Sequence, residues 1–374
     1  MEHKWRLVWS APNFLFMRTP KLRHLAGLTA VLVIELAQLP GAHAAPVDQA
    51  ATRHVVQPGQ SIQAAVDSAK PGDTIEIRPG TYRENIQITT DRLTLVGAGE
   101  STVLSPAEKP SANACGEAGH GICVTGTAED PVSDVRIGSL KVTGFPKNGI
   151  WGSGTDRMTV RNTTTEANGQ QGMGQEMSTR GTFVDNVSRD NKQSGVFLAN
   201  TIDAEGGATD ALGTLVAGNQ LSGNRTGVVV RRLRDLSVEG NTITANCAGV
   251  FIVGDESTPR AGDLNVRHNS VYANNAYCEA TDRLPFIQGA GIVLTGAEGT
   301  RVTGNQVNDN VGTSPMSGGI VLYTSVVGAP NAKNAISRNV MSGNKPADLA
   351  DRDKGPDNTF TDNVCELSAP TGRC

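Results

Sequence analysis

The fold is decided by a short stretch in the middle of the chain, Asn219–Val230, which reads NQLSGNRTGVVV. An asparagine opens the stretch, a second asparagine follows, and a glycine then leads into a short apolar strand. The same order returns from about residue 155 to the C-terminus, with segments of variable length between one copy and the next. A constant core with variable insertions is the sequence signature of a solenoid, in which each repeat forms one coil.

Three marker residues define each copy of the repeat. The first asparagines are Asn162, Asn186, Asn219, Asn241, Asn269, Asn305, Asn339 and Asn363. The second asparagines are Asn168, Asn191, Asn224, Asn246, Asn274, Asn310 and Asn344, and the glycines are Gly149, Gly172, Gly195, Gly227, Gly249, Gly291 and Gly319. Because asparagine amides can bond one another and asparagine tolerates left-handed turns, we expect the asparagines to stack as structural ladders.

Coil stacking follows from burial. One coil of three short strands cannot bury its apolar positions, whereas parallel stacking pairs the backbone of each coil with its neighbours and creates one continuous core. We expect an inward column made of Ile150, Val196, Val228, Val250, Ile292 and Ile320. Composition agrees, because 43 of 374 residues are glycine and only 4% are aromatic. The sequence therefore predicts an all-β parallel β-helix.

The start of the solenoid has its own pattern. Ser61–Ala69 predicts a short amphipathic helix that caps the first coil, with Ser61 as its N-cap and Pro71-Gly72-Asp73 as its stop. Three expected strands follow, at Thr74–Ile77, Asn85–Ile88 and Leu93–Val96.

Residues 1–44 are typical of an export signal. A basic leader precedes an apolar run, and Ala42-His43-Ala44 is a small-x-small cleavage pattern. The alternative is a retained membrane anchor, but the run is short and contains Glu35. We therefore expect one domain, 45–374, that is secreted or held in the cell envelope without a membrane span. Loss of five basic and two acidic residues changes the net charge from −4 to −7, which argues against nucleic acid as a partner.

All six cysteines follow the expected signal. An even number in an exported chain predicts disulfides, most simply between sequence neighbours, although the sequence alone allows other pairings. The cysteines are Cys115, Cys123, Cys247, Cys278, Cys365 and Cys374.

The opening of the chain resembles a known superfamily. The motifs are Val56–Ala65 (VQPGQSIQAA), Pro71–Ile75 (PGDTI) and Pro79–Glu84 (PGTYRE). They resemble the start of pectate-lyase-like parallel β-helix proteins, in the carbohydrate-binding and sugar-hydrolase branch that includes periplasmic copper-maturation proteins and mannuronan epimerases. The resemblance implies a right-handed β-helix solenoid over nearly the whole mature chain. The Asp-Pro-His motif of the epimerases is absent, which puts that activity in doubt.

The glycine-led strands should present one outward face whose side chains could bind or react with a substrate. Side chains alternate along a strand, which places Trp151, Phe197 and Phe251 outward, with Glu176, Arg231 and Tyr323 beside them. Arg232 and Asp255 are further candidates for binding the substrate. Long insertions flank this strand, so we expect them to wall a groove, unless they are merely tolerated surface loops. They are Asn200–Gly213, Gly254–Gly262, Asn275–Ala290, Val311–Ser317 and Thr324–Lys333.

This face has several possible chemistries. In a lyase or epimerase, Arg231 or Arg232 would neutralise a uronate carboxylate, while Glu176 or Tyr323 would move a proton. In a glycoside hydrolase, Glu176 would pair with a second carboxylate, from Asp203, Asp255 or Glu256. The bland alternative is that these side chains are ordinary solvated charges.

Calcium is the one cofactor that the resemblance suggests, and no metal site is assigned. Its oxygen ligands would come from loop carboxylates. The candidates are Asp203, Glu205, Asp255 and Glu256, or Asp348, Asp351, Asp353 and Asp357. Transition metals have less support, because only His54, His120 and His268 follow the signal and no two have ligand spacing.

Two functions are carried forward. The first is a secreted carbohydrate-active β-helix protein that binds, cleaves or epimerises an acidic polysaccharide. The second is a non-catalytic cell-envelope or extracellular module that binds a cell-surface glycan or a protein. A tailspike-like trimeric adhesin is a weaker third interpretation, since no trimerising coiled coil is visible in the sequence.

Overall fold

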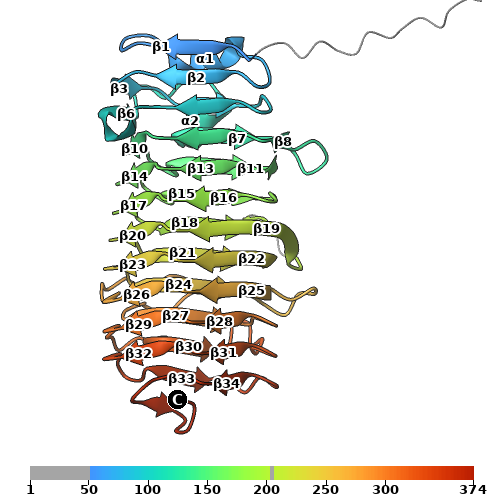
Figure 1. Cartoon of the computed structure of the whole chain (residues 1–374), viewed down its shortest axis with the longest axis vertical. Helices are drawn as coiled ribbons and strands as arrows, with labels where there is room; N and C mark the ends of the chain where they lie inside the picture. Colours follow the sequence, from blue (N-terminus) through green and yellow to red (C-terminus); the bar gives the residue numbers. More distant parts are fainter. Residues whose placement is uncertain (1–50, 203–205) are drawn as a thin grey trace, which may run out of the picture. The chain divides into compact units, whose positions relative to one another are not determined.

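A computed structural model describes residues 51–202 and 206–374. The chain divides into two units, Met1–Gln49 and Ala50–Cys374, and the fold described is that of the second. Its strands form three long parallel sheets, and successive coils follow one another from β1 (Arg53–Val56) to β34 (Thr359–Thr361) (Figure 1). This is the right-handed parallel β-helix that the repeat predicts. The expected export signal, 1–44, lies outside the described residues.

Each complete coil contributes one short strand to each sheet, whereas the coils at the two ends lack a strand in at least one sheet. The first sheet, sheet A, contains β1 (Arg53–Val56), β2 (Thr74–Ile77), β5 (Thr94–Val96), β9 (Arg136–Gly138), β13 (Thr159–Arg161), β16 (Thr182–Val184), β19 (Thr209–Ala217), β22 (Leu233–Glu239), β25 (Gly262–Arg267), β28 (Arg301–Thr303), β31 (Ala335–Ser337) and β34 (Thr359–Thr361). Sheet B contains β3 (Gly80–Arg83), β6 (Thr102–Ser105), β10 (Lys141–Thr143), β14 (Thr164–Glu166), β17 (Val187–Arg189), β20 (Gln220–Ser222), β23 (Thr242–Thr244), β26 (Ser270–Tyr272), β29 (Gln306–Asn308) and β32 (Val340–Ser342).

Sheet C holds the glycine-led strands. It contains β4 (Ile86–Ile88), β7 (Ile122–Thr125), β11 (Ile150–Ser153), β15 (Met173–Glu176), β18 (Ser194–Ala199), β21 (Thr226–Arg231), β24 (Ala248–Val253), β27 (Ala290–Thr295), β30 (Gly318–Tyr323), β33 (Leu349–Arg352) and β35 (Ser368–Ala369). A small separate pair joins β8 (Val132–Ser133) to β12 (Thr155–Asp156). The short helices of the described part are α1 (Ile62–Ser68), η1 (Gly99–Ser101) and α2 (Ala114–Ala118).

The register of sheet C confirms the predicted core. Ile150 pairs with Met173, which pairs with Val196, and the column continues through Val228, Val250, Ile292 and Ile320. The predicted members of this column are all fully buried. Burying one apolar side chain per coil contributes about 1.5–3 kcal/mol relative to exposure, so the column is a principal source of stability.

Both asparagine ladders are present. Asn219 Nδ2 donates to Asn241 Oδ1 at 2.9 Å, and Asn224 Nδ2 donates to Asn246 Oδ1 at 3.2 Å. Each ladder amide also bonds a strand carbonyl, as Asn241 does with Val216. One expected member is wrong. Asn162 is exposed with a left-handed φ of 48°, and the buried ladder position beside Asn186 is held by Thr163.

The start and the disulfides also follow the predictions. Helix α1 buries Ile62 and Val66, and the Ser61 hydroxyl accepts the Ala64 N–H at its N-terminus. Disulfides join sequence neighbours, Cys115–Cys123, Cys247–Cys278 and Cys365–Cys374. Within residues 51–202 and 206–374, no helix combines the length and the apolar character needed to cross a bilayer.

Candidate functional site

The predicted outward face of sheet C exists as two columns. The first column runs from Gln87 through Cys123, Trp151, Gly174, Phe197, Val229, Phe251, Val293 and Val321. The second column runs through Ser153, Glu176, Ala199, Arg231, Val253, Thr295 and Tyr323. Residues far apart in the sequence therefore share one side of the molecule, as the repeat requires.

The expectation of an open aromatic face is wrong for most of the first column. Phe251 is only 4% exposed and Trp151 only 6%. Phe251 belongs to a second apolar cluster outside the coil core, together with Ile287 and Met316 from the insertions before β27 and β30. The disulfide Cys247–Cys278 ties the first of these insertions to the strand beneath it. The insertions expected to wall a groove therefore cover the face in this region.

Glu176 and Arg231 do converge, but on the backbone of one residue. Glu176 Oε2 accepts the Ile202 N–H at 3.0 Å, and Arg231 Nη1 donates to the Ile202 carbonyl at 3.4 Å. The other Glu176 oxygen accepts the Trp151 indole N–H at 3.4 Å. The two side chains thus hold the loop after β18. Tyr323 lies in the same column, three strands beyond Arg231, too far to share a reacting atom with it.

Arg232 and Asp255 bind each other. The Arg232 guanidinium and the Asp255 carboxylate form an ion pair in which both side chains are nearly buried. The second Asp255 oxygen accepts the Ser257 N–H at 2.9 Å. Because a buried charge is stable only when paired, we interpret this ion pair as stabilising the turns that follow β21 and β24.

Several of the carboxylates considered for calcium are engaged by protein groups. Asp348 continues the second ladder, since Oδ1 accepts the Asn344 side-chain amide at 2.9 Å. Asp353 Oδ2 accepts the Asn331 amide at 2.7 Å. Across 51–202 and 206–374, no three His, Cys, Asp or Glu side chains gather as a metal site would need. Asp203 and Glu205 lie outside the described residues.

Two hollows lie at the N-terminal end of the solenoid. One hollow, the amide hollow, has a volume of about 390 Å³, and its lining is Ser61, Gln63, Asp67, Glu84, Gln87, Thr89, Ser111, Ala112 and Asn113. A second, the arginine hollow, has about 430 Å³ and is lined by Gly59, Gln60, Ser61, Thr81, Tyr82, Arg83, Glu84 and Ser111. Each falls in the range of roughly 300–1,000 Å³ that suits small-molecule ligands. Their shared lining residues make them neighbours.

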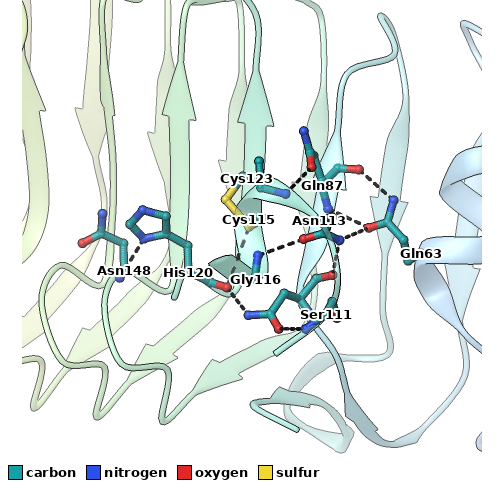
Figure 2. The surroundings of a disulfide bond; sticks show 11 residues. Gln63, Gln87, Ser111, Asn113, Cys115, Gly116, His120, Cys123 and Asn148 are labelled. Carbon is teal, nitrogen blue, oxygen red and sulfur yellow. Dashed lines mark hydrogen bonds between the residues drawn. A yellow bond between two sulfur atoms is a disulfide. The ribbon is translucent and has the colours of Figure 1, made fainter. Parts of the chain in front are cut away.

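Gln63 closes the open edge of sheet C. Its carboxamide oxygen accepts the Gln87 N–H at 2.7 Å, and its amide nitrogen donates to the Gln87 carbonyl at 3.1 Å. The side chain thus replaces the missing neighbour of edge strand β4, which would otherwise leave unpaired backbone groups. Gln63 also bonds Asp67 and Asn113, so the floor of the amide hollow is a connected polar network (Figure 2).

The opposite wall is held rigidly. Ser111 and Asn85 exchange hydrogen bonds, with the Ser111 N–H donating to Asn85 Oδ1 at 3.0 Å and the Asn85 N–H donating to Ser111 Oγ at 2.9 Å. Asn113 accepts the Gly116 N–H and thereby caps α2. The disulfide Cys115–Cys123 then joins α2 to β7 (Figure 2). A covalent link and several hydrogen bonds therefore fix the wall before any ligand arrives.

His120 links this wall to Trp151. Its Nδ1 accepts the Asn148 N–H at 3.1 Å, so the ring is neutral with its proton on Nε2 (Figure 2). Burial, assisted by nearby Lys147, lowers the pKa of His120 to about 4. The ring stacks on Trp151 with 6.4 Å between centroids. Trp151 in turn lies over Gly174, where a Cβ would meet the indole at 2.9 Å.

The amide hollow offers hydrogen-bonding groups, and its charged lining residues, Asp67 and Glu84, are both acidic. The Gln87 amide NH₂, the Thr89 hydroxyl and one Asp67 oxygen have no hydrogen-bond partner within the described part of the chain, whereas both Glu84 oxygens are engaged by the start of α1. Sequence reasoning missed this site. Gln63, Arg83 and Glu84 all lie in the motifs that carry the family resemblance, but those motifs by themselves indicate only the fold.

Comparison with known proteins identifies relatives of the whole solenoid. The family described as periplasmic copper-binding protein (NosD) matches residues 83–275 and 208–366. No curated protein gives a significant match. Among solved structures, the A-module of mannuronan C-5 epimerase AlgE6 from Azotobacter vinelandii is 18% identical, with 82% of this chain and 90% of that chain covered and a TM-score of 0.58.

Two further solved structures are similar. DFA-IIIase from Arthrobacter chlorophenolicus A6, without its lid, is 14% identical, covers 82% of this chain and 90% of its own, and has a TM-score of 0.54. The Dettilon tailspike protein is 13% identical, covers 82% of this chain and 66% of its own, and has a TM-score of 0.52. At such identities these similarities show the fold alone.

Proposed function

The chain belongs to the family of the periplasmic copper-binding protein NosD, and we propose that it is an envelope protein that binds a glycan in the N-terminal hollows without turning it over. The observation that carries this proposal is the polar lining of the amide hollow, at the end of sheet C away from the second apolar cluster. Amide, hydroxyl and carboxylate groups on a rigid frame suit sugar hydroxyls, which both donate and accept hydrogen bonds.

The similar solved structures support a sugar as ligand. A mannuronan epimerase and DFA-IIIase are named for carbohydrate reactions and have the same fold. Export is supported by three disulfides, because such bonds persist in oxidising compartments. Secretion or a place in the periplasm therefore belongs to the proposal.

Binding is favoured over catalysis by the engagement of the candidate acids and bases. Glu176 and Arg231 both hold Ile202, and Arg232 is paired with Asp255. A general acid or base must reach the proton that it transfers, and these groups already have protein partners.

A lyase or epimerase remains the second candidate function, supported by the column that places Glu176 two strands from Arg231 on one face. In that case Glu176→Gln would abolish the formation of product from a uronate polymer. Binding that survives this substitution, with no product from the unaltered chain, would favour the binding function.

Copper does not fit the donor set of the described residues. Copper sites use His, Cys and Met donors, and here every cysteine is in a disulfide. His54 bonds Asp73, and the His120 Nδ1 lone pair already accepts a backbone N–H. Met173, Met316 and Met341 are buried. Met177 and His268 are exposed, but they belong to different coils, and no three His, Cys, Asp or Glu side chains of the described part gather as a metal site would need. We therefore assign no copper site within residues 51–202 and 206–374.

The proposal is tested by glycan-array screening of the full chain, followed by calorimetry. We expect binding that weakens about fivefold or more in the double variant Gln87→Ala, Thr89→Ala, because each lost hydrogen bond contributes about 0.5–1.5 kcal/mol. Asp282→Asn, an exposed carboxylate outside both hollows, is the control and should change nothing. Absence of binding across the array, or binding unaffected by the double variant, would refute the proposal.

A further inference from the structure

We infer that the two N-terminal hollows form consecutive subsites for an acidic oligosaccharide, with the anionic group of one sugar in the arginine hollow and a neutral part of the chain in the amide hollow. This inference rests on the proposed glycan binding and adds the minimum length, the charge and the orientation of the ligand. Three observations carry it: the shared border of the hollows, their unequal charge, and the state of Arg83.

The two hollows are continuous along one border. Ser61, Glu84 and Ser111 line both of them. Glu84 is fixed there, because its carboxylate accepts the Ser61 hydroxyl at 2.9 Å and the Ile62 N–H at 2.7 Å. The start of α1 is therefore already satisfied and offers no anion site of its own. A ligand that fills both volumes must pass this border, which requires at least two sugar units.

The charges of the two hollows differ. The amide hollow is lined by Asp67 and Glu84, and none of its lining residues is cationic. A carboxylate on the ligand would be repelled there. The arginine hollow contains Arg83 opposite the same Glu84 border. A ligand that is anionic at one end and rich in hydroxyls at the other matches this difference.

Arg83 is available to a ligand. It ends strand β3, where Tyr82 points inward and is buried while Arg83 and Thr81 are exposed. The nearby Arg78 is paired with Glu76. Within the described residues, by contrast, Arg83 has no carboxylate at ion-pair distance. A guanidinium binds a carboxylate or sulfate through two parallel N–H groups, which makes it a suitable receptor for a uronate or a sulfated sugar.

The test uses matched pairs of probes with the full chain. Trisaccharides of galacturonate, mannuronate and glucuronate are compared by calorimetry with their methyl esters, which keep the skeleton and remove the charge. We expect at least one acid to bind about two- to fivefold more tightly than its ester, a size typical of an exposed ion pair. The corresponding monosaccharide should bind at least about tenfold more weakly, because it reaches one hollow only.

Two arginine variants locate the effect. Arg83→Ala should remove the preference for the acid and leave ester binding unchanged, while Arg83→Lys should keep part of the preference. Arg283→Ala, at another exposed arginine outside the hollows, is the matched control and should keep all of it. Circular dichroism and Tm verify that each variant is folded.

The outcomes separate this inference from the proposed function. Equal binding of acid and ester, a preference that survives Arg83→Ala, or a monosaccharide as good as the trisaccharide would overturn the subsite assignment while glycan binding stands. Failure of every sugar, charged or neutral, to bind would overturn both.

Discussion

The two ends of the sheet C face follow the same repeat and have opposite character. At the N-terminal end the outward column begins with Gln87, which borders an open polar hollow. Further along, the same column holds Phe251, Val293 and Val321, all buried. The hydrogen-bonded register is continuous between the two ends, so the coil itself does not cause the difference.

The difference comes from what lies over each end. In the second half, a hairpin-like insertion packs on the column, with Cys278 and Ile287 bonded to each other through their backbones and Tyr277 stacked on Phe286. At the N-terminal end, α1 and Ser111–Asn113 line the hollow beside β4, and the Gln87 side chain stays partly exposed. A repeat thus makes a long platform, and the insertions decide which part of it meets solvent.

The largest effect should come from removing the apolar side chain that the insertion covers. Phe251→Ala should lower the free energy of unfolding by about 3–5 kcal/mol, because it removes a buried ring and leaves a cavity. Phe197→Ala, in the same column but only partly buried, is the control and should cost clearly less. Urea denaturation measures both, and equal losses would contradict the covered face.

Opening the cover covalently should have the next largest effect. The double variant Cys247→Ser, Cys278→Ser removes a link between residues 31 apart and should cost about 2–4 kcal/mol. It should also increase binding of a fluorescent apolar dye, because the second cluster becomes accessible. The matched variant Cys115→Ser, Cys123→Ser should destabilise without this dye signal, since a polar network surrounds that bond. A similar dye signal in both variants would remove the contrast between the ends.

Mild acid, above about pH 5, should act mainly on the N-terminal end, through His120. Because the pKa of His120 is lowered to about 4, the folded chain binds fewer protons than the unfolded chain between that pH and about 6.5. Neutral His120 therefore contributes fully to the free energy of unfolding above about pH 6.5. This contribution, on the order of 1–2 kcal/mol, is lost as the pH falls toward 4.

The Trp151 fluorescence that reports on His120 stacking should change in the same pH window. His120→Gln should flatten both the stability profile and the fluorescence change there. The pKa of Asp73, lowered to about 2 mainly by the Lys70 backbone N–H, acts only at lower pH and so does not interfere. An unchanged profile in His120→Gln would show that another group is responsible.

Copper should have the smallest effect. Because the described His, Cys and Met donors are buried, bonded or scattered, we expect the Tm of the full chain to be unchanged by one equivalent of Cu(I) or Cu(II). A saturable rise in Tm that disappears in His120→Gln or His54→Gln would contradict this expectation and would make this chain a copper protein like its family namesake.

Much of the fold could be predicted because the repeat in the sequence of a solenoid reflects the geometry of its coils. The inward column from Ile150 to Ile320, the two ladders, helix α1 and the three disulfides between sequence neighbours all follow from local patterns. The prediction for Asn162 was wrong by one residue. Asn162 and Thr163 are adjacent polar residues at that turn, and Thr163 occupies the buried ladder position.

The sequence by itself determined that the chain winds into coils and which side chains share a column, because period and alternation act between neighbours along the chain. Only the tertiary structure decided which stretch of a column is open, because the paths of long insertions depend on contacts with distant coils. The sequence placed Glu176 and Arg231 on one face, but only the structure showed that both bond the backbone of Ile202 and that Gln63 bonds the backbone of Gln87. Such contacts join elements that no local pattern relates, so the open end of the face could not be predicted from its repeat.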